Sequence, residues 1–542
     1  VAAVMVTGFS PPLDLISKLE HEPGAPPVVI FLLFSALALS VFSGAAFLIT
    51  LKAVVSTAST PIGWMLTIIT IAMLCWLINL MSAFPGHWTY DQFYSLNELV
   101  GGKLSDLHPP LYAVAWLWTI EVGKFLGFNE TFQVGLFLII QVTVFWIFAA
   151  LLALEFNRRW LGALLLIVIA ASPPILSNLG DIGKDGPLGI TGVVAAAAIF
   201  LALQKRSWWF LAFALAPLFY ALSVRTNSIP GVLVLCLYWS FVLISFLSRG
   251  DMSQRQVALK SHFLPYVFLS TQRRQFLSML CCTALLVVSL FALNAAVYNS
   301  AVKNKCCLGI PGYDTLTHDL MGISVRSGEN IMPEYMFTGK PLSVDEIKKV
   351  YLPVSSVNLM GINGMPNAEV RSKLLPLWWR SVINNPRAYL EHRIDLNRYI
   401  LGFTLEPVPF ALFLGSYNNT FPWVEPRVRD LLNKVDIGLR LKTVKDEIWK
   451  YFFLTTDSVV FRIWFYTLII IGSFVAFPFK ISNKFEMLSV TLTLSGLLYF
   501  LPLILVSSSA SFRYFFWTVL CWTIVAFLRF DDALATHKTF AP

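Results

Sequence analysis

Four short segments of this sequence combine carboxylates with cations, a combination that supports acid–base and group-transfer chemistry. They read FPGHWTYDQFYSLNELVGGKLSDLHPPLY, SNLGDIGKDGPLG, SVRTNS and SSSASFRYFF. The candidate residues in them are Asp91, Asp106, His108, Asp181, Lys184, Asp185, Arg225 and Arg513. A positioned carboxylate can take a proton from a reacting group, and fixed cations stabilise negative charge. If the four segments lie on one face of the molecule, they predict a general base beside an anion site.

Each of these residues also has a purely structural interpretation. Asp185, in Asp-Gly-Pro, fits a turn before a helix. Arg225 and Arg513 fit side chains that extend from membrane-span ends toward the surface. Asp91 fits a solvated loop residue or a helix cap, and His108 fits the start of a helix. The functional interpretation therefore depends on the joint pattern rather than on any one residue.

The composition is that of a polytopic membrane protein. Of 542 residues, 57% are hydrophobic and 13% are charged, and the mean hydropathy is +0.69. Soluble domains carry about 25% charged residues. The net charge of +9 fits the Lys and Arg that accumulate in cytoplasmic loops, so we expect no nucleic-acid partner. No His and Asp cluster has the spacing of a tight metal site; a loosely held divalent cation such as Mg²⁺, bridging Asp and phosphate, stays an open alternative.

We expect an all-α fold with about 11 transmembrane helices, since a span needs about 20 apolar residues. The predicted spans are 28–51, 62–82, 131–155, 160–178, 187–204, 208–223, 229–247, 276–300, 458–479, 485–506 and 512–530. No cleavable signal peptide is expected before the first of them. Clusters of Lys and Arg at 158–159, 205–206, 248–275 and 480–484 predict the cytoplasmic side. The segments 83–108, 179–186, 223–228, 301–457 and 507–511 then lie on the outer face, where the charged candidate residues collect.

Residues 109–126 do not fit this alternation of sides. Either this segment crosses the membrane and the number of spans changes by one, or it lies in the interface. It is short, contains Glu121 and Lys124, and has Trp116 near its middle, which favours a helix at the level of the lipid headgroups. Pro109 and Pro110 would occupy its first turn, where the missing N–H groups cost little.

The chain divides into three predicted parts. Residues 1–300 form an N-terminal transmembrane module whose outer loops 83–108 and 179–186 carry the site. Residues 301–457 form a small extracytoplasmic domain, in which Ser343 and Glu346 predict a helix start. Within it, NAEVRSKLLPLWWRSVINNPRAYLEHRIDLNRYILGF is typical of amphipathic helices at a membrane surface. Residues 458–542 form the C-terminal transmembrane helices.

Several motifs resemble the GT-C superfamily of membrane glycosyltransferases. SDLHPPLYAV is similar to the His-Pro-Pro-Leu-Tyr segment of the protein O-mannosyltransferase and lipid A aminoarabinose transferase families. Asp91 in HWTYDQFYS, Asp185 in KDGPLG and the Arg513-Tyr514 pair in SFRYFF match the acidic outer loops and the late Arg-Tyr segment of those families. NNPRAYLEHRIDLN and YDTLTHDLMGIS also resemble bacterial serotype-converting O-antigen glucosyltransferases. Gln92 departs from the pattern, because several relatives have a second acid there, and this makes a metal-binding pair less expected.

The resemblance implies an inverting transfer of a sugar, such as the hexose glucose, from a polyprenyl phosphate. The acceptor would be a surface glycan such as O-antigen, or a lipid, outside the inner (cytoplasmic) membrane of a bacterium. The expected catalytic residues are Asp91, Asp106 and Asp185, with Asp91 as the base because burial would raise its pKa. Binding of the donor phosphate or sugar is expected from His108, Lys184, Arg225, Arg513, Tyr514 and Asp181. The expected partners are the lipid-linked donor, the acceptor and membrane lipids.

Two other function classes stay open at this point. A secondary transporter or flippase would need ionisable residues near the bilayer midplane and broken helices in repeated halves, but the charges here stand at the outer ends of the spans. An enzyme of the O-antigen-ligase type would use a large outer loop rich in Arg and His. Segment 301–457 does contain Arg380, Arg387, His392, Arg393 and Arg398.

Overall fold

The described part of the chain is helical. The computed structural model describes residues 60–87, 90–105, 108–247, 270–303, 313–337, 340–354, 368–404, 426–434, 442–476 and 483–537. No β-strand occurs in these ranges; one isolated parallel β-bridge joins His87 to Asp181. The all-α prediction is confirmed for them.

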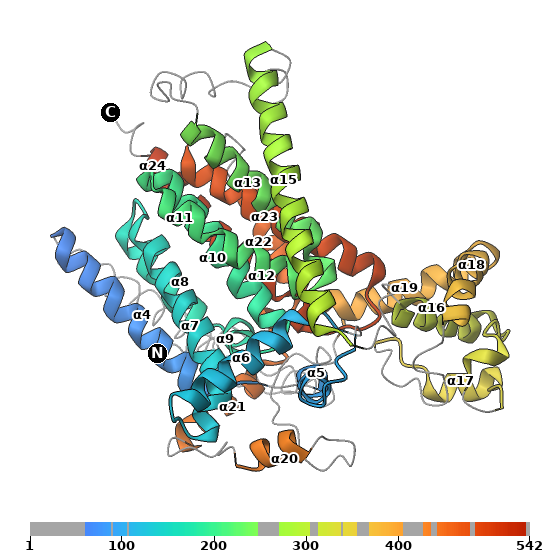
Figure 1. The fold of residues 1–542 in the computed structure, drawn as a ribbon. Coiled ribbons are helices and arrows are strands. Elements are labelled where there is room, and N and C mark those ends of the chain that lie inside the picture. Colours follow the sequence, from blue (N-terminus) through green and yellow to red (C-terminus); the bar gives the residue numbers. More distant parts are fainter. Residues whose placement is uncertain are drawn as a thin grey trace, which may run out of the picture.

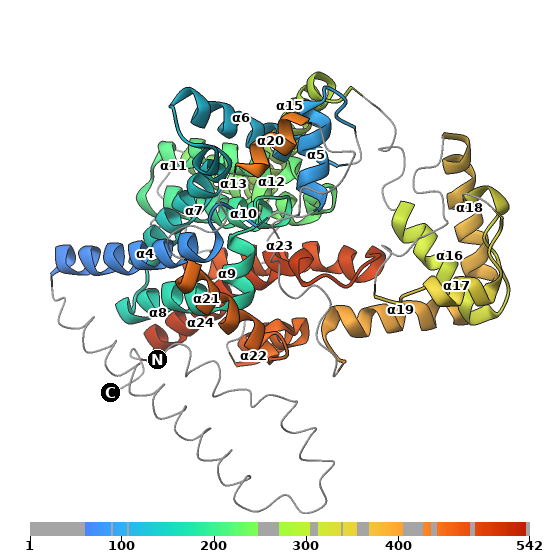
Figure 2. The same ribbon diagram turned by 90° about the horizontal axis from the view of Figure 1, so that it is seen from below.

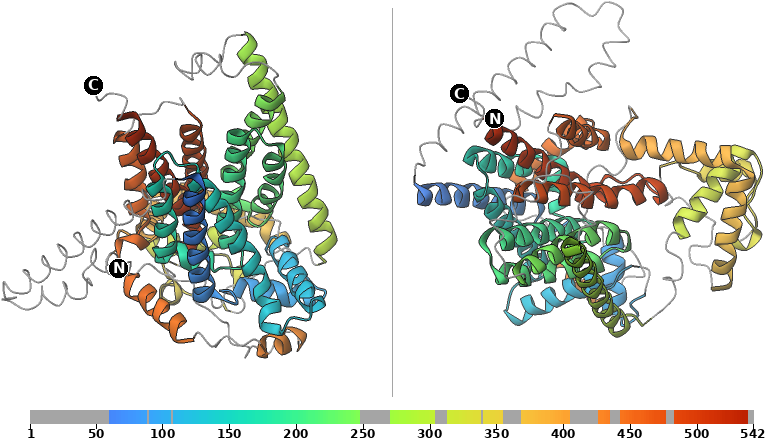
Figure 3. Two further views of the ribbon diagram at one scale, coloured as in Figure 1. Left: turned by 90° about the vertical axis from the view of Figure 1, so that its left-hand side faces the viewer. Right: turned by 90° about the horizontal axis from the view of Figure 1, so that it is seen from above.

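Most of the long helices lie side by side in one bundle (Figure 1). In the bundle lie α4 (Pro61–Ala83), α7 (Glu130–Leu154), α8 (Arg159–Ala171), α9 (Pro173–Leu179), α10 (Asp185–Lys205), α11 (Trp208–Phe213), α12 (Leu215–Ser223), α13 (Ile229–Leu247), α15 (Ser270–Ala301), α22 (Ile463–Ala476), α23 (Lys484–Val506) and α24 (Phe516–His537). The 3-10 turns η1 (Thr226–Ser228) and η7 (Phe512–Phe515) begin α13 and α24. Figure 2 and Figure 3 show that α5 (Tyr90–Val100) and α6 (Leu111–Phe125) lie together at one end of the bundle, which we call the site end.

Six described helices are long and apolar enough to cross a membrane, which confirms the membrane-type architecture but not a count of about 11 spans. They are α4, α7, α10, α13 with η1, α15 from Arg274, and α23. The bent pair α8–α9 makes a seventh if it is one span. The predicted span 28–51 lies outside the described residues.

Three other predicted spans are interrupted or shortened. Segment 160–178 bends by 74° between α8 and α9, because Pro173 and Pro174 lack the N–H groups that would continue α8. Segment 208–223 divides into α11 and α12, and together they form an apolar stretch shorter than a full span. In the predicted span 458–479, the apolar helix covers only Ile463–Val475 and is also too short.

Helix α10 lies at the centre of the bundle, and its packing against the surrounding helices holds its N-terminus in place. In its most apolar stretch, 94% of the residues are buried, and it packs on α7, α12, α13 and α24. Its small residues let the neighbouring helices approach closely. A Cβ at Gly189 would lie 2.5 Å from the Phe516 ring, and one at Gly192 would lie 2.3 Å from Trp517. Asp185, the first residue of α10, is therefore held rigidly at the site end.

The segment after α4 contains two helices rather than a loop. Helix α6 buries Tyr112, Trp116 and Ile120 against its neighbours, whereas Trp118 is 64% exposed. At 15 residues α6 is shorter than the ~20 residues that a span requires. Its place in the membrane interface stays a prediction.

A smaller unit lies beside the bundle and is formed by α16 (Tyr313–Ser327), α17 (Val344–Val350), α18 (Ala368–Asn384) and α19 (Pro386–Leu401) (Figure 1). We call it the side domain. It has an apolar core of its own, which includes Leu320, Ile347 and Leu374. The predicted helix start is confirmed, because Ser343 and Glu346 form a capping box on α17.

The remaining described helices return to the bundle. α20 (Pro426–Asn433) packs on α5, and α21 (Lys442–Thr455) packs on α4 and α9. On α21, Trp449 Nε1 donates to the Ser82 carbonyl at 3.0 Å, and the Tyr451 hydroxyl donates to the Ala171 carbonyl at 3.1 Å.

Candidate functional site

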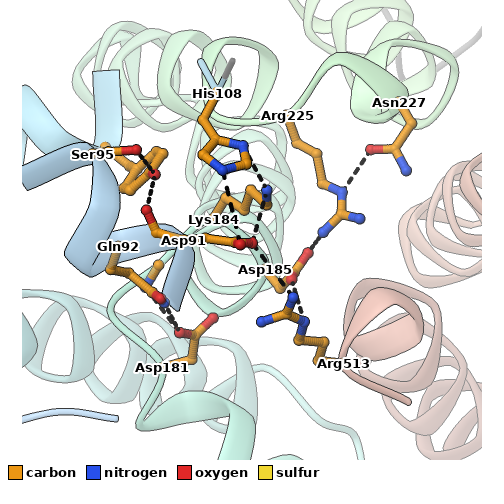
Figure 4. A network of polar contacts seen from close by, with 12 residues as sticks. Asp91, Gln92, Ser95, His108, Asp181, Lys184, Asp185, Arg225, Asn227 and Arg513 are labelled. Carbon is orange, nitrogen blue, oxygen red and sulfur yellow. Dashed lines mark hydrogen bonds and ion pairs between the residues drawn. The ribbon is translucent and has the colours of Figure 1, made fainter. Parts of the chain in front are cut away.

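The site is built where five separate segments meet at the site end of the bundle (Figure 4). They are α5, the residue His108 before α6, the start of α10, the turn between α12 and η1, and η7. The sequence-predicted residues that the structure brings together are Asp91, His108, Asp181, Lys184, Asp185, Arg225, Arg513 and Tyr514. Asp106 lies outside the described residues.

Asp91, on the first turn of α5, faces three basic side chains. Its Oδ2 lies 3.0 Å from Lys184 Nζ and 3.4 Å from Arg513 Nη2, and its Oδ1 lies 3.8 Å from His108 Nε2. The Tyr112 hydroxyl donates to the Asp91 carbonyl at 3.0 Å, which fixes the backbone of α5 against α6. Asp91 therefore faces two cations and an imidazole from a backbone that is itself held in place.

Asp185 forms a second carboxylate centre. It pairs with Arg225 Nη1, and its Oδ2 lies 3.4 Å from Arg513 Nε. Its position in the first turn of α10 is favourable, because the helix dipole stabilises a negative charge there. Arg225 Nε donates to Asn227 Oδ1 at 2.8 Å. Arg513 thus bridges Asp91 and Asp185.

Tyr514 supports both arginines. The Arg225 guanidinium lies 4.5 Å and the Arg513 guanidinium 5.2 Å from the centre of the Tyr514 ring. A cation over an aromatic face gains about 0.5–1 kcal/mol at an exposed site and more when desolvated. We therefore interpret Tyr514 as a platform that holds the two cations near each other.

The Asp181 carboxylate is occupied by the protein itself. Oδ1 accepts from Gly183 N at 2.9 Å and from Gln92 Nε2 at 2.8 Å, and Oδ2 accepts from Gly186 N at 2.9 Å. Burial raises the pKa of Asp181, and the two backbone N–H groups partly offset this. These contacts favour a role in shaping the start of α10 over the predicted contact with the donor.

The expected direction of the Asp91 pKa is wrong. Burial alone raises it, but Lys184, His108 and Arg513 together outweigh burial and hold the pKa well below its usual value. The sequence predicts that burial raises the pKa of Asp91, whereas the sign of the shift depends on a cation 3.0 Å away. As it stands in the structure, Asp91 is ionised but is a weak base.

His108 is a neutral imidazole in this arrangement. Burial and then Lys184 lower its pKa to about 3. Lys184 Nζ lies 3.2 Å from His108 Nδ1, and an ammonium can only donate. Nδ1 is therefore the acceptor, and the remaining proton is assigned to Nε2, which faces Asp91.

Three cations of the site pair directly with two carboxylates. Among the described residues, Lys184, Arg225 and Arg513 pair with Asp91 and Asp185, whereas the nearby Asp181 carboxylate is held by hydrogen bonds of its own loop. Side-chain exposure is 12–17% for the cations and His108 and 23% for Asp91. Three fixed cations close together and within reach of solvent are an arrangement that can bind an anion.

The same side chains do not fit a resident divalent cation. Within the described residues, no group of three or more His, Cys, Asp and Glu side chains could hold a metal ion. Asp91 and Asp185 oxygens point at cations instead. We therefore place no step of the chemistry on Mg²⁺.

An apolar pocket of about 210 Å³ lies next to the start of α10. It is enclosed by α7, α10, α11 and the segment through α12, and its lining includes Phe137, Ile140, Pro187, Ile190 and Tyr220. Gln141, also in its wall, donates from Nε2 to the Asp181 carbonyl at 2.9 Å. One apolar pocket thus borders the loop that carries Lys184 and Asp185.

Sequence reasoning did not assign several residues that shape the site. In the sequence, Gln92 stands out only because relatives have an acidic residue at that position, yet its side-chain amide donates a hydrogen bond to Asp181. Asn227, two positions after Arg225, orients that arginine. His87 joins segment 83–108 to segment 179–186 and the end of α9. Its backbone N–H donates to the Gly180 carbonyl at 2.8 Å, and its ring Nδ1 lies 2.9 Å from the Ser177 carbonyl oxygen. The only signal for these residues was their closeness in sequence to a charged candidate.

Comparison of this chain with family models, with curated proteins and with solved structures finds no match. What the site does must therefore be argued from its geometry.

Proposed function

We propose that this protein is an inverting glycosyltransferase of the membrane, GT-C-like in its arrangement. It would move a sugar, such as a hexose, from a polyprenyl phosphate to a surface glycan or lipid acceptor. The observation that carries the proposal is the convergence of three cations on two carboxylates beside an apolar pocket. A lipid phosphate has the matching chemistry, with an anionic head and an apolar tail.

The cations would stabilise the leaving phosphate. When the acceptor oxygen bonds to the anomeric carbon, the bond from that carbon to the phosphate oxygen breaks and its electron pair stays on the phosphate. Arg225 and Arg513 can each bind phosphate oxygens in a bidentate way, and Lys184 adds a point charge. Such preorganised charges cost no reorganisation at the moment of reaction.

Donor binding would also activate the base. In the structure Lys184 and Arg513 hold the pKa of Asp91 low. A phosphate that takes up these cations removes them from Asp91 and adds negative charge nearby, so the pKa of Asp91 rises toward a value suited to a general base. The acceptor hydroxyl then gives its proton to Asp91 only when the donor is in place. This order would protect the donor from hydrolysis.

The apolar pocket would take the first part of the lipid chain. Its walls belong to α7, α10 and α12; Lys184 and Asp185 lie at the start of α10, and Arg225 follows α12. In the membrane orientation predicted from the Lys and Arg clusters, this pocket faces the outer leaflet. We therefore place the reaction on the outer side of a bacterial cytoplasmic membrane, where about 11 spans would complete the bundle.

The structure adds no support for an enzyme of the O-antigen-ligase type. The Arg and His residues that favoured it do not form one site in the described residues. His392 and Arg393 are buried with Asp319, whereas Arg380, Arg387 and Arg398 are exposed on α18 and α19.

The test uses purified protein in nanodiscs with a synthetic polyprenyl-phosphate hexose and a surface-glycan extract. We expect acceptor-dependent release of polyprenyl phosphate, and we expect Asp91→Asn to lower it by about 10²–10⁴-fold. The control is Glu121→Gln, which neutralises an exposed carboxylate on α6. No release from any common polyprenyl-phosphate hexose by the folded wild type would remove the transferase proposal, and full activity in Asp91→Asn would remove Asp91 as the base.

A further inference from the structure

The side domain presents a row of large apolar side chains that no described residue covers. On α18, Leu375 is 55% exposed, and Trp379 and Ile383 are each 59% exposed. These residues are spaced by four, so at about 100° per residue they lie within an arc of about 80° on one side of the helix. Leu374 and Ser381, on the other side of α18, are buried.

Helix α19 continues this surface and adds positive charge. Leu390 is 57% and Ile394 is 56% exposed, and Arg387 and Arg398, also exposed, lie on the same side by the same spacing rule. The opposite side, which includes His392, is buried against α16. We call the exposed side chains Leu375, Trp379, Ile383, Arg387, Leu390, Ile394 and Arg398 the α18–α19 face. Arg380 lies at its edge, and the exposed Glu391, which pairs with Arg387 at 2.8 Å, lies on it as well.

The orientation of the two helices suits a flat apolar partner. Figure 1 and Figure 2 show α18 and α19 running across the direction of the bundle helices. Within the side domain, α17 lies on the side of the site end, and α18 lies on the side toward the middle of the bundle (Figure 1). The buried sides of α18 and α19 pack on α16, so the α18–α19 face points away from α16.

The face also continues into the surface of a bundle helix. Just after α19, Phe403 is 59% exposed and stacks on Trp464 of α22, with ring centres 6.5 Å apart and an interplanar angle of 7°. Further along α22, Leu468 and Ile471 are 57% and 51% exposed. An apolar helix of a membrane-type bundle exposes such residues to lipid, so the apolar surface extends from α22 onto the side domain.

We propose that the α18–α19 face docks on the bilayer surface, with anionic phospholipid as its partner. The apolar side chains enter the boundary between headgroups and acyl chains, as those of interfacial amphipathic helices do. Arg387 and Arg398, with Arg380 at the edge, outnumber the single exposed Glu391 and meet the lipid phosphates. The proposal goes beyond the transferase function and does not depend on it.

The experiment places an environment-sensitive fluorophore, nitrobenzoxadiazole, on single cysteines in the full chain. Leu390→Cys and Ile394→Cys report on the face, and Lys348→Cys on exposed α17 is the matched control. Cys281, Cys282, Cys306 and Cys307 are replaced by Ser so that the label is specific. The protein is studied in nanodiscs of phosphatidylcholine with phosphatidylglycerol, with and without lipids that carry a doxyl quencher.

We expect blue-shifted emission and loss of fluorescence on doxyl lipid at positions 390 and 394, and neither effect at 348. Arg380→Gln, Arg387→Gln and Arg398→Gln together should remove the part of this quenching that depends on phosphatidylglycerol. Water-like emission at 390 and 394 would overturn the proposal. So would blue-shifted emission without quenching by lipid, because it would show that a second copy of the chain covers the face. Quenching that does not depend on phosphatidylglycerol would overturn the choice of anionic lipid.

Discussion

The described residues contain one cluster of Asp, Arg and His side chains at the site end of the bundle and another inside the side domain. In the second, Asp319 Oδ1 lies 3.0 Å from His392 Nε2, and Oδ2 lies 2.7 Å from Arg393 Nη2 and 2.8 Å from Trp378 Nε1. His392 Nδ1 lies 2.7 Å from the Tyr351 hydroxyl. One carboxylate faces one arginine, and the Asp319 and His392 side chains are 0% exposed.

The comparison separates a cluster that binds from a cluster that holds the fold. The candidate site uses similar residue types, but it gathers three cations and has side chains within reach of solvent. The Asp319 carboxylate is fully hydrogen-bonded and its cluster is buried, so a ligand cannot reach a charge there. Residue type alone does not distinguish the two clusters; the number of cations and the exposure do.

The two clusters are connected through one loop. Arg393 Nη1 donates to the Ser507 carbonyl at 2.7 Å, the Thr315 hydroxyl donates to the Val506 carbonyl at 2.6 Å, and Ala510 N donates to the Val354 carbonyl at 2.9 Å. η7, which carries Arg513, begins two residues after Ala510. The side domain therefore fixes the loop from which Arg513 reaches the site.

The largest expected effect is on the fold and comes from Asp319→Ala. It leaves Arg393 buried without its carboxylate, and breaking a buried pair costs about 3–5 kcal/mol. We expect a large fall in the apparent melting temperature in detergent, with Asp446→Asn on exposed α21 as the control. Asp91→Asn should lower the melting temperature less, because Asp91 is 23% exposed and water can solvate the cations that it leaves. Equal shifts in Asp319→Ala and Asp91→Asn would end the distinction between the clusters.

The next effect is on catalysis and comes from Arg513→Ala. Loss of one preorganised donor to the developing charge lowers kcat by about 10²–10³-fold. Lys349→Gln, which also removes a cation but on exposed α17, should leave kcat unchanged. If Arg513→Ala lost as much stability as Asp319→Ala and kept its activity per folded molecule, Arg513 would have a structural role and not a catalytic one.

The pH dependence tests whether the donor activates Asp91. Because cations lower the pKa of Asp91 in the donor-free protein, the acid limb of kcat/KM should lie below the ordinary Asp value of about 4. In the donor complex the cations turn to the phosphate, so the pKa rises and the acid limb of kcat should lie at higher pH. His108, with a pKa of about 3, should add no step near neutrality. Coincident acid limbs in both profiles would contradict the activation by donor.

The sequence predicted which residues gather at the site for a physical reason. Charged residues are rare in a membrane-type chain, and each needs a partner, so Asp91, Lys184, Asp185, Arg225 and Arg513 had few places to pair except with one another. The membrane-type all-α architecture follows from the long apolar stretches in the same way.

The properties that could not be predicted from the sequence depend on exact distances between side chains and on backbone hydrogen bonds. The low pKa of Asp91 depends on a 3.0 Å contact with Lys184, and Asp181 is occupied by backbone N–H groups of its own loop. The bend between α8 and α9 follows from Pro173 and Pro174, but the apolar run on both sides concealed it. The link from Arg393 to Ser507 joins residues 114 positions apart.

The smallest expected effect tests the connection between the clusters through Arg393→Lys. Lysine keeps the charge beside Asp319 but cannot span Asp319 and Ser507 with two fixed N–H groups, so about one hydrogen bond, near 1 kcal/mol, is lost. We expect the melting temperature to fall less than in Asp319→Ala. Faster amide exchange should appear at residues 507–514, and kcat should fall several-fold with KM for the acceptor unchanged. If exchange in that loop and kcat both stay at wild-type values, the side domain does not position Arg513, and the two clusters act independently.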